Sequence, residues 1–136
     1  MLLAAPILLG AAPAGRLDVA VERLRSTSGQ IRICLTRLPA NFPDCKGGSQ
    51  IWTRSAPATG TPTIAFGNLP SGDYALSAFH DENGNAKLDT FARIPREGFG
   101  FSRNPAIRFG PPSFRQARFS IASGEIRQTV RMKYFL

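Results

Sequence analysis

The residues best suited to chemistry lie in "HDENGNAKLD", residues 80 to 89, where side chains that carry an oxygen recur at alternate positions. A hard cation such as Ca²⁺ takes about 6–8 oxygen ligands, and alternate residues of a loop can point them toward one centre. The spacing matches the first two-thirds of an EF-hand loop, with a backbone carbonyl as one further ligand. We therefore predict a Ca²⁺ site, whose candidate ligands here are Asp81, Asn83, Asn85, Lys87 (carbonyl) and Asp89.

The loop departs from the EF-hand pattern in two places. The sixth position, normally glycine, is Ala86, and the twelfth, normally a bidentate glutamate, is Ala92. We expect Glu97 to supply the missing carboxylate. The alternative is a polar turn without an ion, because Asn and Asp side chains hydrogen-bond to their own backbone. In that case Arg93 or Arg96 could pair with an aspartate and supply the positive charge.

This loop begins a stretch from 81 to 112 that has no clear periodic pattern, and phenylalanines recur along it and just after it. Such a long irregular segment in a small domain is usually functional, or contains elements that were missed. The rings could form a recognition surface beside the neighbouring arginines, or a satellite core. "GFGF" favours the core, because an extended chain would place both of its rings on one side. The five rings are Phe91, Phe99, Phe101, Phe109 and Phe114.

The first residues predict export. Residues 2–12 are apolar and uncharged, and the small residues around Pro13 are typical of a signal-peptidase site before Gly15. We therefore expect a signal peptide over 1–14, a single domain over 15–136, and a periplasmic or extracellular location. In such an oxidising compartment we expect Cys34 and Cys45 to form a disulfide.

The chain carries 17 basic and 9 acidic side chains, a formal net charge of +8. No nucleic-acid motif accompanies this charge, so we expect no specific nucleic-acid partner. Five basic residues fall on the polar side of their predicted strands, and neighbouring strands would join them into one anion-binding surface for acidic glycans, lipid headgroups or an acidic protein. These residues are Arg32, Arg118, Arg127, Arg131 and Lys133.

Seven short stretches alternate apolar and polar residues, the pattern of strands with one buried face. Gly- and Pro-rich turns separate them, and no stretch predicts a long helix. We therefore predict an all-β fold, a seven-stranded antiparallel β-sandwich with one long irregular loop. The predicted strands are Leu17–Glu22, Ile31–Thr36, Ile51–Arg54, Thr63–Phe66, Tyr74–His80, Ala117–Ile121 and Ile126–Tyr134.

The blocks "GDYALSAFHDENGN", "PREGFGFS" and "FGPPSF" resemble a family of small exported bacterial proteins that is catalogued only as a domain of unknown function. The resemblance covers most of the mature chain, although this family usually has glycine in place of Ala86. "FGNLPSGDYAL" is also similar to the turn and strand of prealbumin-like and carboxypeptidase-regulatory-like domains, which implies an Ig-like sandwich. Neither resemblance implies an activity.

The residues favour a non-catalytic binding or structural module of the cell envelope. The single histidine, His80, lies at the end of a predicted strand, and Ser77 or Ser102 would be its partner nucleophile in a hydrolase that also used the loop carboxylates. That hydrolase is the alternative, together with a binder of anionic glycans or lipid headgroups through the cationic strands. No apolar stretch is long enough to span a membrane, which takes about 20 residues.

Overall fold

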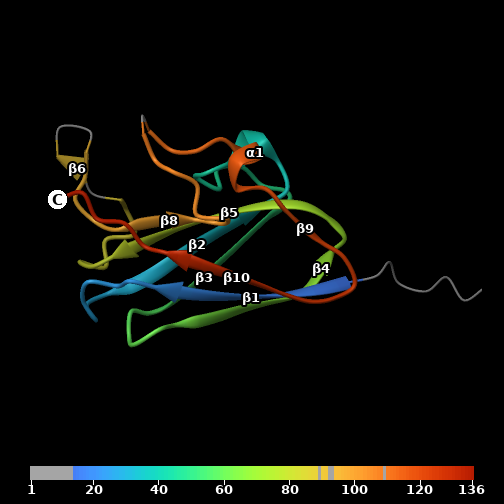
Figure 1. Cartoon of the computed structure of the whole chain (residues 1–136), viewed down its shortest axis with the longest axis horizontal. Helices are drawn as coiled ribbons and strands as arrows, with labels where there is room; N and C mark the ends of the chain where they lie inside the picture. Colours follow the sequence, from blue (N-terminus) through green and yellow to red (C-terminus); the bar gives the residue numbers. More distant parts are fainter. Residues whose placement is uncertain (1–13, 89, 92–93, 109) are drawn as a thin grey trace, which may run out of the picture.

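The structure is a computed structural model that describes residues 14–88, 90–91, 94–108 and 110–136 (Figure 1). In this part of the chain almost all regular structure is β. The strands are β1 (Ala14–Glu22), β2 (Gln30–Thr36), β3 (Ile51–Pro57), β4 (Thr63–Pro70), β5 (Gly72–Asp81), β6 (Thr90–Phe91), β7 (Ile94–Pro95), β8 (Phe99–Phe101), β9 (Phe119–Ile121) and β10 (Gly124–Arg131). The helical segments are a 3-10 turn (Pro39–Asn41) and the single turn α1 (Phe114–Ala117).

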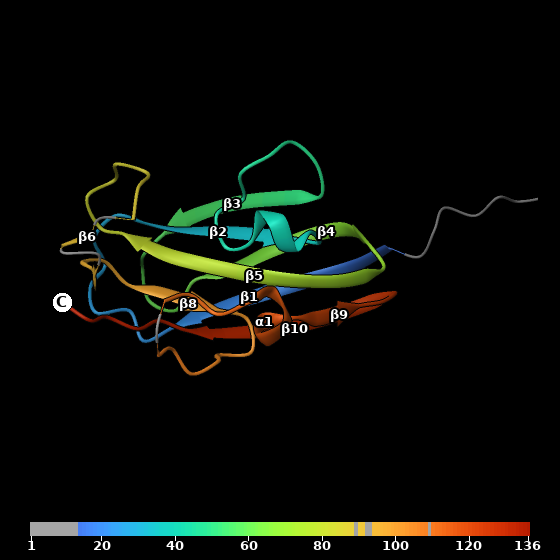
Figure 2. The same ribbon diagram turned by 90° about the horizontal axis from the view of Figure 1, so that it is seen from above.

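Two sheets form the body of the domain. The small sheet has the order β10-β1-β4, and the large sheet has the order β3-β2-β5-β8, with β9 paired to the other end of β5. Strands β1 and β10 run parallel, and the other pairs in these sheets are antiparallel. Figure 2 shows β1 and β10 side by side. The two-residue strands β6 and β7 pair only with each other.

The hydrophobic core lies between the two sheets because alternate residues of each strand point inward. Leu17, Val19 and Val21 come from the small sheet, and Ile33 and Leu35 of the large sheet belong to the same core cluster. All five side chains are at most 2 % exposed, so these strands bury their inward faces in the core between the sheets.

The other face of the large sheet is covered in part. The 3-10 turn and α1 both lie on this side, away from β1 and β10 (Figure 1). The side chain and backbone of Ser113 form a capping box with Gln116, which starts α1. A second apolar cluster, built around Phe99, Phe101 and Ala117, therefore sits on the outer face of the large sheet.

All seven predicted strands are present, and the all-β prediction is confirmed. The predicted number was wrong, because the two sheets contain eight strands within the described residues. The additional strand is β8, in the stretch that was predicted to be irregular. A wholly antiparallel fold was also wrong, because β1 and β10 are parallel. Ala117 ends α1 and does not begin a strand.

The predicted signal peptide lies almost entirely outside the described residues, and β1 begins at Ala14. The described residues include no helix that is long and apolar enough to cross a membrane.

Candidate functional site

Asp81 organises the loop that the sequence singled out. Its side chain is fully buried at the end of β5. One carboxylate oxygen accepts hydrogen bonds from Nε of Arg32 at 2.7 Å and from the backbone N–H of Ala86 at 2.8 Å. The other accepts from the backbone N–H of Asn85 at 3.2 Å. Burial alone would raise the pKa of this carboxyl, but these donors outweigh it and hold the pKa below its usual value.

The alternate oxygens of the loop accept hydrogen bonds from the backbone. Oδ1 of Asn83 accepts from the N–H of Asn85 at 3.2 Å, and Oδ1 of Asn85 accepts from the N–H of Lys87 at 2.9 Å. Each side chain thus closes a turn two residues long, the turn chemistry that Asn and Asp favour. The positive charge beside Asp81 comes from Arg32 on β2, whereas the alternative without an ion assigns this charge to Arg93 or Arg96.

The side chain of Glu97 binds the backbone of the same loop. Its Oε2 accepts a hydrogen bond from the backbone N–H of Glu82 at 2.6 Å. The side chain of Glu82 turns toward Arg25 and Ser26, whose hydroxyl donates to it at 3.0 Å. The hydrogen bond from Arg25, and to a smaller extent the one from Ser26, hold the pKa of Glu82 below its usual value, although burial opposes them. The structure therefore brings Asp81 and Glu97 to one loop, but each binds backbone N–H groups.

Within the described residues, no group of three or more His, Cys, Asp or Glu side chains is placed to hold a metal ion. Both oxygens of Asp81 already accept protein donors. Of the six predicted ligands, Asp89 lies outside the described residues.

Calcium binding by this loop stays a prediction. A bound ion would stabilise the folded state by mass action, so the melting temperature should rise by several degrees in millimolar Ca²⁺ relative to chelator. Differential scanning calorimetry measures this, with Asp89→Asn as the variant that loses the shift. Identical melting in Ca²⁺ and chelator would contradict the prediction.

Ala86 has the backbone conformation that glycine would have at the sixth position of an EF-hand loop, with a φ of 62°. A side chain in this left-handed region costs about 1 kcal/mol. We therefore predict that Ala86→Gly stabilises the protein by about 0.5–1 kcal/mol, measured by urea unfolding. Ala65→Gly, on the exposed face of β4, is the control and should destabilise. A loss of stability in both variants would contradict the prediction.

His80 is fully buried, and both of its ring nitrogens lie within hydrogen-bond distance of a partner. Its Nε2 donates to the carbonyl of Ser28 at 2.7 Å, and its Nδ1 is hydrogen-bonded to the hydroxyl of Tyr134 at 2.8 Å. The hydroxyls of the two candidate nucleophiles donate to carbonyl oxygens, Ser77 to Pro43 and Ser102 to Ala117. Neither serine contacts His80 through a hydrogen bond that would activate it as a nucleophile.

A groove of about 1230 Å³ lies on the outer face of the large sheet. Its floor consists of two rows of side chains that the strand register places side by side across four strands. The first row contains Ser55, Arg32, Phe79 and Phe99, and the second contains Thr53, Cys34, Ser77 and Phe101. The floor is therefore polar toward β3 and aromatic toward β8.

The aromatic end explains "GFGF". Phe99 and Phe101 pair with outward residues of β5 and are each 7 % exposed, so they pack on the outer face. Gly100 faces inward, where a Cβ would collide with the side chain of Val130. This confirms the satellite-core interpretation for Phe99 and Phe101, and Phe114 packs against the same cluster. Phe109 and the side chain of Phe91 lie outside the part of the chain that the structure describes.

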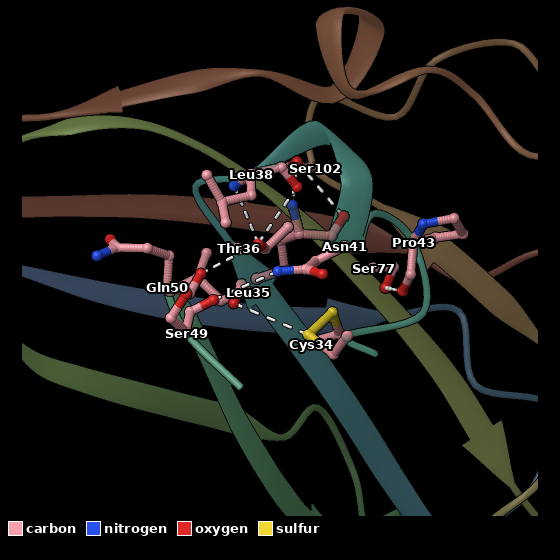
Figure 3. The surroundings of a disulfide bond; sticks show 12 residues. Cys34, Leu35, Thr36, Leu38, Asn41, Pro43, Ser49, Gln50, Ser77 and Ser102 are labelled. Atoms are coloured by element: carbon pink, nitrogen blue, oxygen red, sulfur yellow. Dashed lines mark hydrogen bonds between the residues drawn. A yellow bond between two sulfur atoms is a disulfide. The ribbon is translucent and has the colours of Figure 1, made fainter. Parts of the chain in front are cut away.

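The disulfide holds one wall of the groove. Cys34 points outward from β2 and is bonded to Cys45, with 5.7 Å between their Cα atoms, as predicted. The backbone carbonyl of Pro43 accepts a hydrogen bond from the hydroxyl of Ser77 at 2.6 Å, and this bond connects the same loop to β5. Figure 3 shows the disulfide and the hydrogen bond between Ser77 and Pro43. The loop that contains residues 43–46 is therefore fixed above the sheet.

The five basic residues do not form one sheet surface, because Arg32 lies on β2 of the large sheet, whereas Arg127 and Arg131 lie on β10 of the small sheet. Arg32 is also paired with Asp81. Arg118 directly precedes β9, and Lys133 follows β10 and bridges to β8. Along β1 and β10, acids lie beside the arginines: Arg127 is in register with Asp18, and Arg131 with Glu22.

Sequence reasoning missed the groove and its basic rim. Besides Arg54 of β3, whose guanidinium packs over the ring of Phe66, three exposed basic residues line it: Lys46, Lys87 and Arg108. They come from three loops, and no sequence spacing relates them. One sequence feature did point to a covered outer face. The outward side of β5 carries Phe79 and Ser77, and its inward side is apolar too. Such a strand is covered on both sides.

Fold and site together define the class of the protein, a small all-β domain of one mixed and one antiparallel sheet, with a disulfide and a groove on the outer face of the antiparallel sheet. The profile of a family described as "Uncharacterized protein conserved in bacteria (DUF2141)" matches residues 19–129. The chain therefore belongs to this family, which confirms the resemblance seen in its sequence blocks. No curated protein and no solved structure matches it.

Proposed function

We propose that this protein is an exported, non-catalytic binding module of the bacterial cell envelope and that the groove on the outer face of the large sheet is its ligand site. The observation that carries the proposal is the groove itself, about 1230 Å³ in volume with an aromatic end and a polar end. Ligand sites are typically concave and mostly apolar, with a few polar groups that fix orientation.

The groove is built on rigid elements, as a binding site requires. Four paired strands supply its floor, and a disulfide holds the loop beside it. The polar groups of the floor are Arg32, Thr53, Ser55 and Ser77. The disulfide supports export, because such bonds persist in oxidising compartments. An Ig-like or prealbumin-like sandwich remains our proposal for the finer fold, supported by the two-sheet core.

The polar side chains favour binding over catalysis. Both ring nitrogens of His80 are engaged in the core, away from the groove. Ser77, the candidate nucleophile that does line the groove, donates its proton to the carbonyl of Pro43. A nucleophilic serine needs an adjacent base to take that proton.

A fragment screen by NMR tests the site. A library of small acids, amines, sugars and aromatic compounds is titrated into ¹⁵N-labelled protein at millimolar concentration. We expect hits to shift the amide signals of Thr53, Ser55, Ser77 and Phe79. Thr53→Trp, on the exposed floor, should abolish these shifts by filling the groove, whereas Thr63→Trp on β4 should leave them unchanged. A library without any hit in the groove would overturn the proposal.

The disulfide should stabilise both the fold and the groove. Its cysteines are 11 residues apart, and opening so small a loop should cost about 2 kcal/mol. We predict that Cys34→Ser/Cys45→Ser lowers the free energy of urea unfolding by this amount and lowers the affinity for any ligand of the groove. Wild-type protein treated with dithiothreitol should match the double variant. Unaltered stability in both samples would contradict the prediction.

A further inference from the structure

We propose that the ligand of this groove is a free single-chain amphiphile with an acidic head group, of the class of a long-chain carboxylate. This inference rests on the proposed function, because it names the class of molecule that the groove would bind. Three features of the described residues carry it: an apolar end, a basic rim and two floor rings that offer no stacking surface for sugars.

The apolar end is open to solvent. Leu88 and Phe135 line the groove and are 38 % and 52 % exposed, among the large hydrophobic side chains that the described chain leaves exposed. The ring of Phe135 packs edge-on against Phe99, with 5.2 Å between centroids, so it extends the aromatic floor. Apolar surface gathered in a concave site marks a place where an apolar group binds.

The rim is basic. Lys46, Lys87 and Arg108 line the groove and are exposed, and among the described residues none of them has an ion-pair partner. Asp44 is the one acid among the described lining residues. The charge of Arg32 on the floor is already neutralised by Asp81. The positive potential therefore lies at the edge of the apolar floor, which suits an acidic head group outside and an aliphatic chain inside.

Two of the rings at this end do not suit a sugar. Phe99 and Phe101 are each only 7 % exposed, and Phe101 packs edge-on against Phe42. Their faces are used within the protein cluster and offer no open platform for a pyranose ring. An aliphatic chain needs only apolar contact, and each methylene buried gains about 0.8 kcal/mol, close to fourfold in affinity.

The test titrates dodecanoate, decanoate, dodecyltrimethylammonium and dodecyl maltoside into ¹⁵N-labelled protein, each below its micelle concentration. We expect dodecanoate to bind at least five times more tightly than the cationic and neutral amphiphiles of the same chain length, and about twofold to fourfold more tightly per methylene than decanoate. The shifted amides should include those of Phe79, Phe99 and Leu88. Equal or tighter binding of dodecyltrimethylammonium, or no dependence on chain length, would overturn the proposal.

A matched pair of variants tests the rim. Lys46→Glu/Arg108→Glu should weaken dodecanoate binding at least tenfold, whereas Arg118→Glu/Arg127→Glu, with the same change in net charge, should leave it within twofold. Equal loss in both double variants would show a nonspecific charge effect and overturn the assignment. Binding to phosphatidylglycerol vesicles in the absence of dodecanoate binding would also overturn it. If other fragments still bind the groove, the proposed function survives the failure of this ligand class.

Discussion

Replacing Arg32 by methionine is expected to destabilise the protein by about 4 kcal/mol at pH 7. Methionine keeps much of the apolar stem but removes the charge that faces Asp81 at 2.7 Å. The Asp81 carboxylate is fully buried, so it would remain with two backbone N–H donors and no cation. Urea unfolding of both proteins at pH 7 measures the loss.

The effect should depend on pH in a defined direction. In the native protein the pKa of Asp81 is lowered, so its contribution to stability is present above about pH 4, the pKa of an unfolded aspartate, and is lost as the pH falls through the folded pKa. Without Arg32, burial is no longer offset, so Asp81 should protonate more readily. The difference between native protein and Arg32→Met should therefore shrink between pH 7 and pH 3.

Two further variants separate the pair from general charge effects. Arg32→Met/Asp81→Asn should recover part of the loss, because no buried charge then lacks a partner. Arg16→Met is the matched control, since the Arg16–Asp18 pair is exposed and should contribute less than about 1 kcal/mol. A loss of similar size from Arg16→Met, or no dependence on pH, would contradict our assignment of Arg32 to Asp81.

The strands could be predicted because side chains in a strand alternate between two faces, and in β1 and β2 the faces differ in polarity. The partners of the strands could not. The parallel pairing of Leu17 with Ile126 joins opposite ends of the chain, and local alternation carries no information about it. Strand β8 was hidden for another reason, since its inward residue is glycine and leaves no apolar signal on that side.

The loop at Asp81 was predicted in part. Alternate Asn and Asp correctly marked a tight, organised turn, because these side chains bind nearby backbone whether or not an ion is present. The charge that Asp81 faces comes from Arg32, 49 residues earlier in the chain, and only the pairing of β2 with β5 brings the two together. The groove was not predictable, because three separate loops supply its basic rim.

The second large effect is expected at Gly98, where alanine should cost about 3 kcal/mol. A Cβ at this position would collide with the ring of Tyr134. This ring cannot move freely, because its hydroxyl binds Nδ1 of His80 and the guanidinium of Arg25 lies 4.6 Å from its centroid. Displacing the ring would leave the buried Nδ1 of His80 without its hydrogen bond, which alone costs about 1–3 kcal/mol.

The measurement is urea unfolding of Gly98→Ala beside Gly67→Ala, whose added Cβ would meet no atom within 4 Å. The control should stay within about 0.5 kcal/mol of the native protein. Tyr134→Phe removes the hydroxyl and keeps the ring, so it should cost about 1–2 kcal/mol. Because Gly98→Ala breaks the same hydrogen bond, the double variant should lose less than the sum of the single losses. Strict additivity would mean that the ring stays in place beside the added methyl group and that the backbone next to β8 moves to relieve the collision.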